Sequence, residues 1–153
     1  MEENGIREMI AEDIPRILEM AVDFHSHFAD KGLGYNKLNF AQYCRFLMGG
    51  GSTAVFVMVK DGEVAGTIAG IVTPWFMNFS QKVLTEQWWW VDPKYRGGIS
   101  SARLLDCLIK WGKERGASLM IMVSIDSGTQ DAVEEYYKSR GMTPLENHFI
   151  QEI

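Results

Sequence analysis

The stretch Val91-Asp-Pro-Lys-Tyr-Arg-Gly-Gly-Ile-Ser-Ser-Ala-Arg-Leu-Leu105 ends a Trp-rich apolar run and opens a helix-like pattern through an Arg-Gly-Gly loop. Small residues such as Gly97 and Gly98 let backbone N–H groups approach a phosphate closely. The first turn of a helix adds unpaired N–H donors and about half a positive charge. The stretch therefore predicts a binding site for an anion, with an ordinary strand-to-helix turn as the alternative.

Composition limits the class of protein. With 153 residues, of which 46% are hydrophobic, the chain can bury the core of one domain, and we expect a single domain over residues 1–153. No apolar run approaches the roughly 20 residues of a membrane span, which favours a soluble, cytoplasmic protein without membrane contact. The formal net charge of −5 argues against a nucleic-acid partner, because phosphates reward clustered Lys and Arg. Cys44 and Cys107 are expected to be buried free thiols, and the three histidines show no zinc spacing, so no metal is expected.

The first part of the chain predicts two helices after a short strand at residues 6–10. Asp13 is expected to cap a helix that runs to about Phe28, because its apolar residues recur at three- and four-residue steps. Asn39 is expected to cap a second helix, which ends in the glycines at 49–51.

The rest of the chain predicts a hairpin followed by alternating strands and helices. Asp61-Gly62 is its strongest hairpin signal. The aromatic segment 73–80 is expected to pack over the sheet edge, with a pocket lining as the alternative. Residues 119–125 lack alternation, so both faces should be covered, as in a central parallel strand. Strands are expected at 53–60, 63–72, 82–91, 119–125 and 148–152, and helices at 99–115 and 131–140.

The loop and the order of elements resemble the GNAT family of acyl-CoA N-acyltransferases, and loosely its compact phage and bacterial members. In that family a strand ends near V-x-P, and Arg/Gln-x-x-Gly-x-Gly/Ala follows at a helix N-terminus. Read from Arg96 without a gap, the family's two small positions fall on Ile99 and Ser101. With a one-residue deletion, Gly98-Ile-Ser-Ser-Ala102 aligns with Gly-Ile-Gly-Ser-Ala, and both registers stay open. The resemblance implies an α+β fold, an α/β/α sandwich whose mixed sheet has about six to seven strands and a splayed central parallel pair.

The resemblance also implies that acetyl-CoA is the cofactor. Its diphosphate would lie against backbone N–H groups of the loop, and its pantetheine arm would pair with main-chain groups of the splayed strands. The residues expected to bind it are Trp90, Val91, Arg96, Gly97, Gly98, Ile99, Ser100, Ser101, Ala102, Ser124 and Gln130.

Two residues are candidates for catalysis of direct acetyl transfer to a primary amine. Many family members place a base where Glu86 stands, and its apolar neighbours could raise its pKa. The direction of this side chain is open, and a hydrogen-bonded edge carboxylate is an equal alternative. The run 133–142 is similar to the family's Leu-Tyr-x-x-x-Gly-Phe ending, in which the tyrosine protonates the cofactor sulfur. This similarity implies that role for Tyr137.

The acceptor residues are expected to be Phe24, Phe28 and Trp75, because specificity in the family comes mainly from the first two helices and the connection before the Trp run. The acceptor would be a primary amine on a small molecule, a peptide or a protein. The main alternative is a GNAT-fold module that binds CoA or another ligand without turnover. A Rossmann-like nucleotide binder fits poorly, because the chain has no G-x-G-x-x-G. The sequence leaves monomer and homodimer open.

Overall fold

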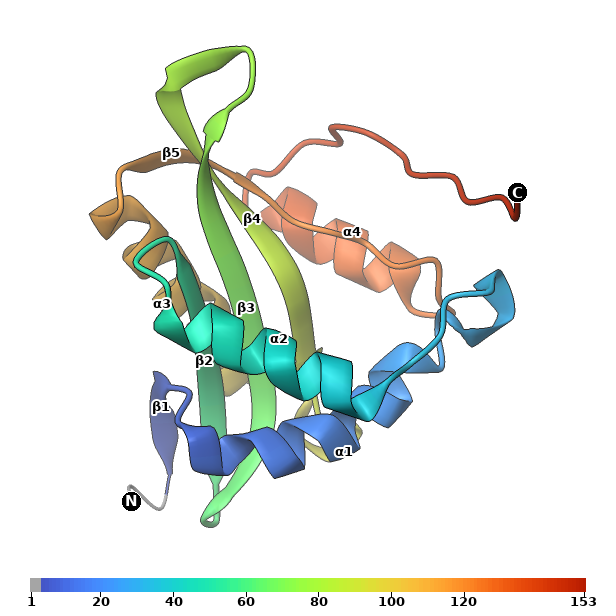
Figure 1. The fold of residues 1–153 in the computed structure, drawn as a ribbon. Coiled ribbons are helices and arrows are strands. Elements are labelled where there is room, and N and C mark those ends of the chain that lie inside the picture. Colours follow the sequence, from blue (N-terminus) through green and yellow to red (C-terminus); the bar gives the residue numbers. More distant parts are fainter. Residues whose placement is uncertain (1–3) are drawn as a thin grey trace.

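The computed structural model describes residues 4–153, which form one five-stranded sheet in the order β1-β2-β3-β4-β5 with helices on both faces (Figure 1). The strands are β1 (Gly5–Glu8), β2 (Thr53–Lys60), β3 (Glu63–Trp75), β4 (Asn78–Val91) and β5 (Ala117–Ile121). The helices are α1 (Ile14–His25), α2 (Lys37–Gly49), α3 (Ile99–Glu114) and α4 (Gln130–Ser139).

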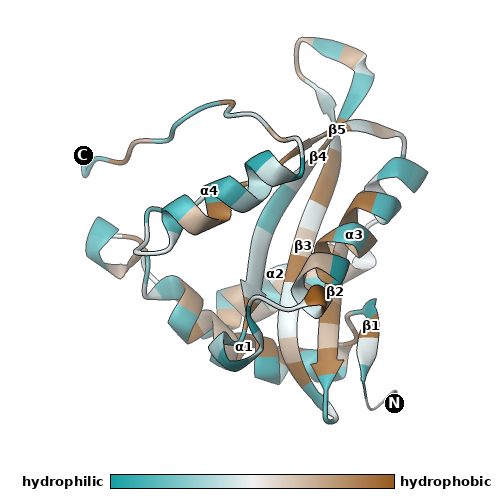
Figure 2. Cartoon of the chain, turned by 180° about the vertical axis from the view of Figure 1, so that it is seen from behind, coloured by the Kyte–Doolittle hydropathy of each residue, from teal (hydrophilic) through white to brown (hydrophobic). Residues whose placement is uncertain are grey.

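Two hydrophobic clusters, one on each face of the sheet, confirm the predicted α/β/α sandwich. Helices α1 and α2 pack on one face through residues such as Ile17 and Leu47, and the free thiol of Cys44 is buried there. Helix α3 covers the other face through Leu104 and Leu108, with the free thiol of Cys107 half-buried at its margin (Figure 2). No helix in the described part of the chain is both long and apolar enough to cross a membrane.

The caps of the first two helices differ in detail from the prediction. Asp13 occupies the N-cap position of α1 as predicted, but its side chain makes no cap hydrogen bond to that helix. It ends a short 3₁₀ turn, where its Oδ2 accepts the backbone N–H of Ile10 at 2.9 Å and pairs with Arg7 at 2.7 Å. Asn36, and not Asn39, caps α2, because the Asn36 side chain accepts the N–H of Asn39 at 3.0 Å. Asn36 and Asn39 both lie near the start of α2, and asparagine is a good cap by type.

Two hairpins build the centre of the sheet. The one at Asp61-Gly62 is confirmed, and its two residues have φ of 52° and 78°, the positive values that a type I′ turn requires. The second hairpin takes the place of the predicted aromatic connection, since β3 and β4 extend until Trp75 pairs with Asn78. Its tip projects beyond the sheet (green in Figure 1), with Phe76 70% exposed. The prediction that this segment packs over the sheet edge is therefore wrong.

The sheet has fewer strands than the six to seven expected, and its last strand is an edge strand. Residues 148–152 are not a strand, because the segment 142–153 leaves the end of α4 without pairing to the described sheet (red in Figure 1). Strand β5 lies at the edge, and Leu119 on it is 54% exposed, so its second face is not covered as a central strand's would be. A strand-like sequence pattern does not show which edge of the sheet the segment can pair with.

The three consecutive tryptophans of β4 alternate across the sheet. Trp88 is buried in the cluster under α1 and α2, and Trp90 packs against the same cluster. Trp89 packs against the cluster on the α3 face. This alternation places aromatic rings on both sides of the end of β4.

A β-bulge in β4 sets the direction of Glu86. Gly70 of β3 faces Glu86, whereas the preceding residue Ala69 faces Trp88, so Gln87 is an extra residue in β4. Alternation continued backward from Trp88 would put Glu86 on the α1–α2 face. The extra residue moves the Glu86 side chain to the opposite face.

Strands β4 and β5 are the predicted splayed parallel pair. Their ladder runs from Lys82, which pairs with Ala117, to Thr85, which pairs with Ile121. Beyond that point β4 continues to Val91 while the chain after β5 diverges from it and turns into α4 (Figure 1). The residues of β4 after Thr85 therefore have a ladder on the β3 side only.

Helix α3 lies close to β4 because Gly112 has no side chain. A Cβ added at Gly112 would lie 2.6 Å from Cδ2 of Leu84. Gly112→Val should therefore overpack the core and lower the free energy of unfolding by about 1–3 kcal/mol in a urea titration. Gly49→Val is the matched control, because Gly49 is also helical and a Cβ added there meets no atom within 4 Å. This variant tests the helix propensity of valine without overpacking. Equal stability of the two variants would contradict this account of the packing.

Candidate functional site

The loop between β4 and α3 places the N-terminus of α3 close to the end of β4. The Asp92 carboxylate accepts the N–H of Lys94 at 3.1 Å and begins a 3₁₀ turn over Pro93–Tyr95. Gly97 has a φ of 76°, a left-handed conformation that favours glycine. Gly98 then precedes the first residue of α3. The Arg-Gly-Gly sequence is thus the turn that orients α3.

The N-terminus of α3 is open to an anion. No side chain caps it, and the Oγ of Ser101 is buried without a hydrogen-bond partner among residues 4–153. A Cβ added at Gly98 would lie 4.0 Å from the backbone N of Ser100, so a larger residue there would stand over these donors. The first turn also holds Ile99, which is exposed, and Ala102. Free N–H groups and the helix dipole together favour a negative group at this place.

Arg96 is held at the end of β4. Its Nε donates to the carbonyl oxygen of Val91 at 2.8 Å, and its guanidinium carbon lies 4.2 Å from the centroid of the Trp90 ring. This cation–π contact orders the side chain without neutralising it. A positive charge is therefore fixed beside the loop that leads into α3.

Glu86 and Tyr137 meet at the backbone of Val123, just beyond β5. The N–H of Val123 donates to Oε2 of Glu86 at 2.9 Å. The hydroxyl of Tyr137 donates to the carbonyl oxygen of Val123 at 2.8 Å. Two side chains thus satisfy main-chain groups just past the end of the β4–β5 ladder. The structure brings the two predicted catalytic residues together at the point where the strands separate.

Burial shifts the protonation of both side chains. It raises the pKa of Glu86 to about 7, although the hydrogen bond from the Val123 N–H acts in the opposite direction. The pKa of Tyr137 is raised well above its ordinary value, first by burial and then by the negative charge of Glu86. Near neutral pH, Glu86 can therefore take up or release a proton, while Tyr137 stays a phenol.

The bulge that directs Glu86 is tied to α2, a feature that the sequence analysis missed. The hydroxyl of Tyr43 donates to Oε1 of Gln87 at 2.7 Å. Next to it, the indole N–H of Trp88 donates to the buried Oγ1 of Thr67 at 3.2 Å. No local pattern in the sequence indicates which residue of a strand forms a bulge. The contact between Tyr43 and Gln87 could therefore not be predicted from the sequence.

Ser124 and Gln130 meet at Glu134, which the sequence analysis also missed. Oγ of Ser124 donates to Oε1 of Glu134 at 3.3 Å, and Nε2 of Gln130 donates to the same oxygen at 3.0 Å. The spacing of four residues between Gln130 and Glu134 was the available signal, because such residues face each other on a helix. Both predicted cofactor-binding residues therefore lie on the α4 side of the diverging strands.

Phe24 and Phe28 lie together at the end of β4, whereas Trp75 does not join them. The ring of Phe24 is 5.5 Å from that of Trp90 and 5.4 Å from that of Phe28. Trp75 lies at the tip of the β3–β4 hairpin, eight residues along β3 from Thr67, the partner of Trp90. At about 3.3 Å per residue this separation is roughly 26 Å.

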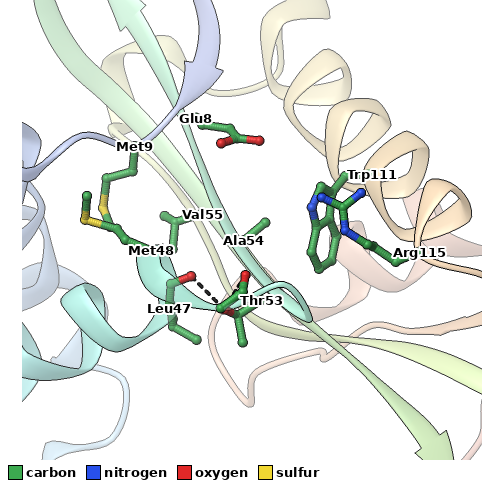
Figure 3. Close-up of a pocket in the computed structure, with 10 residues that line it drawn as sticks. Glu8, Met9, Leu47, Met48, Thr53, Ala54, Val55, Trp111 and Arg115 are labelled. Carbon is green, nitrogen blue, oxygen red and sulfur yellow. Dashed lines mark hydrogen bonds between the residues drawn. The ribbon is translucent and has the colours of Figure 1, made fainter.

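The two best-formed cavities among the described residues lie near the sheet, and neither is large enough for a cofactor. The larger, of about 80 Å³, lies between β1, the start of β2 and the end of α3. Figure 3 shows Arg115 beside the Trp111 ring, with the Glu8 carboxylate across the pocket. Ligand pockets usually measure about 300–1,000 Å³, so this one holds a few water molecules and we assign no site to it. The smaller cavity is apolar and adjoins Phe24 and Trp90.

Solved structures with the same arrangement cover nearly the whole chain. A transcriptional regulator from Bacillus halodurans C-125 has a TM-score of 0.79 at 17% identity, over 98% of this chain and 99% of the other. The aminoglycoside N-acetyltransferase AAC(6′)-Iy in complex with CoA has a TM-score of 0.77 at 15% identity, over 98% and 94%. An aminoglycoside acetyltransferase from an uncultured soil metagenomic sample has a TM-score of 0.74 at 16% identity, over 98% of each chain. At these identities the likeness shows the fold alone.

Sequence comparison identifies the family. No curated protein matches the chain significantly. The model of the acetyltransferase (GNAT) family matches residues 14–142, which span most of the sheet and all four helices. The chain therefore belongs to the GNAT acetyltransferase family.

Proposed function

We propose that this chain is an acetyl-CoA-dependent N-acetyltransferase that transfers the acetyl group directly to a primary amine. Membership of an acetyltransferase family supports the reaction class. The observation that carries the proposal is the meeting of Glu86 and Tyr137 at the Val123 backbone, where the parallel strands separate. A proton acceptor and a proton donor at one place are what amine acylation requires of an enzyme.

The start of α3 suits a diphosphate. It offers the backbone N–H groups of Ile99 and Ser100, the unpartnered hydroxyl of Ser101 and the nearby charge of Arg96. Gly97 and Gly98 keep side chains away from these donors. The chemistry of this donor set fits the phosphates of CoA.

The diverging strands suit the extended arm of CoA. Main-chain groups of Trp90 and its neighbours on the β5 side of β4 have no ladder partner in the described sheet, and Ser124 lies on the opposing segment. An extended ligand can add to such an edge as a strand would. Bound acetyl-CoA supplies an acetyl group that is already activated as a thioester.

Glu86 is the proposed base. An alkylammonium group titrates near pH 10.4, so a bound amine must lose a proton before it can attack. With its pKa raised to about 7, Glu86 is close to the best match for a base at neutral pH. Oε2 is engaged by the Val123 N–H, and Oε1 is the oxygen that takes the amine proton.

Tyr137 is the proposed donor to the departing sulfur. While Glu86 is ionised, its charge raises the pKa of Tyr137 and keeps the phenol a weak acid. Protonation of Glu86 by the amine removes that charge, so the Tyr137 hydroxyl becomes a stronger donor at the moment when the thiolate forms. Its present acceptor, the Val123 carbonyl, keeps the hydroxyl in place until then.

The acceptor is proposed to bind against the aromatic rings at the end of β4. Phe24, Phe28 and Trp90 form an apolar wall on the α1 side of that strand. Because Glu86 lies on the opposite face of the sheet, the amine would have to reach it through the gap where β4 and β5 diverge. Aminoglycosides are the first amines to test, because solved structures with this fold include aminoglycoside acetyltransferases. Polyamines and lysine-containing peptides complete the panel.

An assay of thiol release tests the proposed activity. Purified protein is mixed with acetyl-CoA and each amine of the panel, and free CoA thiol is followed with a thiol-reactive dye. We expect thiol release that depends on the amine, with one N-acetylated product molecule per thiol by mass spectrometry. CoA binding without release for any amine would instead favour a binding module.

Glu86→Gln should lower kcat by about 100-fold or more at neutral pH, because the amide cannot accept the proton. In the wild type, kcat should rise about tenfold per pH unit up to pH about 7, where Glu86 becomes ionised, and then level off. This rise of kcat with pH should be absent in Glu86→Gln. Glu135→Gln neutralises an exposed carboxylate on α4 and should leave the profile unchanged. A wild-type profile that is flat between pH 5 and 8 would exclude Glu86 as the base.

Tyr137→Phe should lower kcat by roughly 10- to 100-fold, the value of one hydrogen bond to a charged group, with little change in the Kd for CoA. Tyr136→Phe removes the neighbouring hydroxyl, which contacts Arg140, and should behave as wild type. Full activity of Tyr137→Phe in the thiol-release assay would make Tyr137 a packing residue only.

A further inference from the structure

The tip of the β3–β4 hairpin, residues 75–79, is apolar and exposed. Phe76, Met77 and Phe79 are 70%, 76% and 77% exposed, and Trp75 is half-buried. The rings of Trp75 and Phe76 lie together, with their centroids 4.5 Å apart. The tip projects beyond the helices and the rest of the sheet in both views (Figures 1 and 2). Exposed apolar residues are normally scattered singly, so this contiguous patch marks a surface that another molecule covers.

The sequence around the tip has no negative charge. Residues 64–85 contain no Asp or Glu, although the chain has 20 of them and a net charge of −5. The one charged residue in that range is Lys82, which pairs with Pro74 where the tip begins. On both strands, the chain that leads to the tip therefore presents no carboxylate.

A second basic segment lies beside Lys82. The C-terminal end of α3 and the turn after it carry Lys113 and Arg115 on either side of Glu114. A Cβ added at Gly116 in this turn would lie 3.9 Å from Nζ of Lys82. No ion pair within the described part of the chain engages Lys82 or Lys113. Charges farther away are screened over about 8 Å at physiological salt, so the acidic balance of the whole chain does not cancel this local positive charge.

The distance between the apolar tip and its basic base matches the surface of a lipid bilayer. Phe76 lies two residues beyond Pro74, the partner of Lys82, and at about 3.3 Å per residue this is roughly 7 Å. Apolar side chains of proteins that lie on a bilayer enter roughly 5–10 Å into the boundary between headgroups and acyl chains. With the rings of the tip at that depth, the Lys82 ammonium lies at the level of the lipid phosphates. Tryptophan, here Trp75, is enriched at this boundary.

The shape of the tip favours a bilayer over a protein. A narrow projection needs a matching hollow on a protein partner, and the best-formed cavities of a second copy, of about 80 and 20 Å³, are too small for its rings. Two tips that met end to end would be convex against convex and would bury little of each other. A lipid layer has no fixed shape and closes around an apolar projection.

We propose that the hairpin tip docks on the surface of an anionic phospholipid bilayer, with the rings of residues 75–79 among the headgroups and with Lys82 and Lys113 beside lipid phosphates. Buried apolar area and the attraction of basic groups to anionic lipid act together in such attachment. The expectation of no membrane contact rested on the lack of a spanning run, and a peripheral tip needs none. The proposal does not depend on the proposed enzymatic activity.

Docking through the tip would leave the candidate site open. The tip lies at one end of β3 and β4, whereas Val91 and the start of α3 lie at the other end of β4. A chain held at its tip therefore presents the α3 end of β4 to solvent.

Vesicle flotation tests the docking. The wild type should float with phosphatidylcholine vesicles that contain phosphatidylserine, more weakly with phosphatidylcholine alone, and less at high salt. Phe76→Ser should lower the partition coefficient about tenfold or more, because one large side chain fewer leaves water. Its urea unfolding should match that of the wild type, since Phe76 is exposed. Leu38→Ser, the matched control, changes an exposed residue of α2 and should keep the wild-type partition coefficient.

Lys82→Gln tests the role of charge. This variant should bind about fivefold more weakly to the vesicles with phosphatidylserine, and almost as well as the wild type to phosphatidylcholine alone. Unchanged binding of Lys82→Gln to the phosphatidylserine vesicles would overturn the assignment to anionic lipid.

Two further results would overturn the docking itself. One is a wild type that stays in solution with both kinds of vesicle, and the other is a Phe76→Ser variant that floats as well as the wild type. Light scattering separates the bilayer from a second copy. A wild-type mass of twice the 17.4 kDa of one chain that falls to one chain in Phe76→Ser would assign the tip to a second copy and would contradict the proposal.

Discussion

The early end of the β4–β5 ladder is the constraint on which the site depends. Backbone pairing stops at Thr85 and Ile121, and beyond it the N–H and carbonyl groups of Val123 are satisfied by Glu86 and Tyr137. Two ionisable side chains thus stand where a regular sheet would have only main-chain bonds. The same divergence exposes the main-chain groups of β4 that lead to the start of α3. In the function that we propose, this separation of the strands provides both the place for an extended ligand and the chemistry at its end.

The bulge at Gln87 makes this arrangement possible. Without the extra residue, Glu86 would face α1 and α2 and would not reach Val123. Burial on the face that it occupies raises its pKa to about 7, and its charge raises that of Tyr137 in turn. The two groups interact electrostatically, so a proton gained by Glu86 changes the acid strength of the Tyr137 hydroxyl. Such coupling suits the proposed roles of Glu86 as base and Tyr137 as donor.

Local signals predicted local structure well, and long-range contacts decided the rest. The Asp61-Gly62 turn was readable because its positive φ values restrict the residue types. The role of Glu86 was not readable, because its direction depends on a bulge that Tyr43 holds from 44 residues away. Residues 148–152 were predicted to be a strand, but pairing requires an edge, and none in the described sheet receives this segment. Trp75 was grouped with Phe24 because the resemblance places acceptor specificity in the segments that carry them, and the longer β3–β4 hairpin separates the two.

Calorimetric titration with CoA tests the central claim most directly, namely that the start of α3 and the diverging strands hold this cofactor. The wild type should bind CoA saturably with one site per chain. Gly98→Val should bind at least about tenfold more weakly, about 1.4 kcal/mol, because its side chain would cover the N–H donors of α3. It should keep its fold, since a Cβ there meets nothing closer than 4.0 Å. Absence of binding to the wild type, or equal affinity in Gly98→Val, would contradict the account.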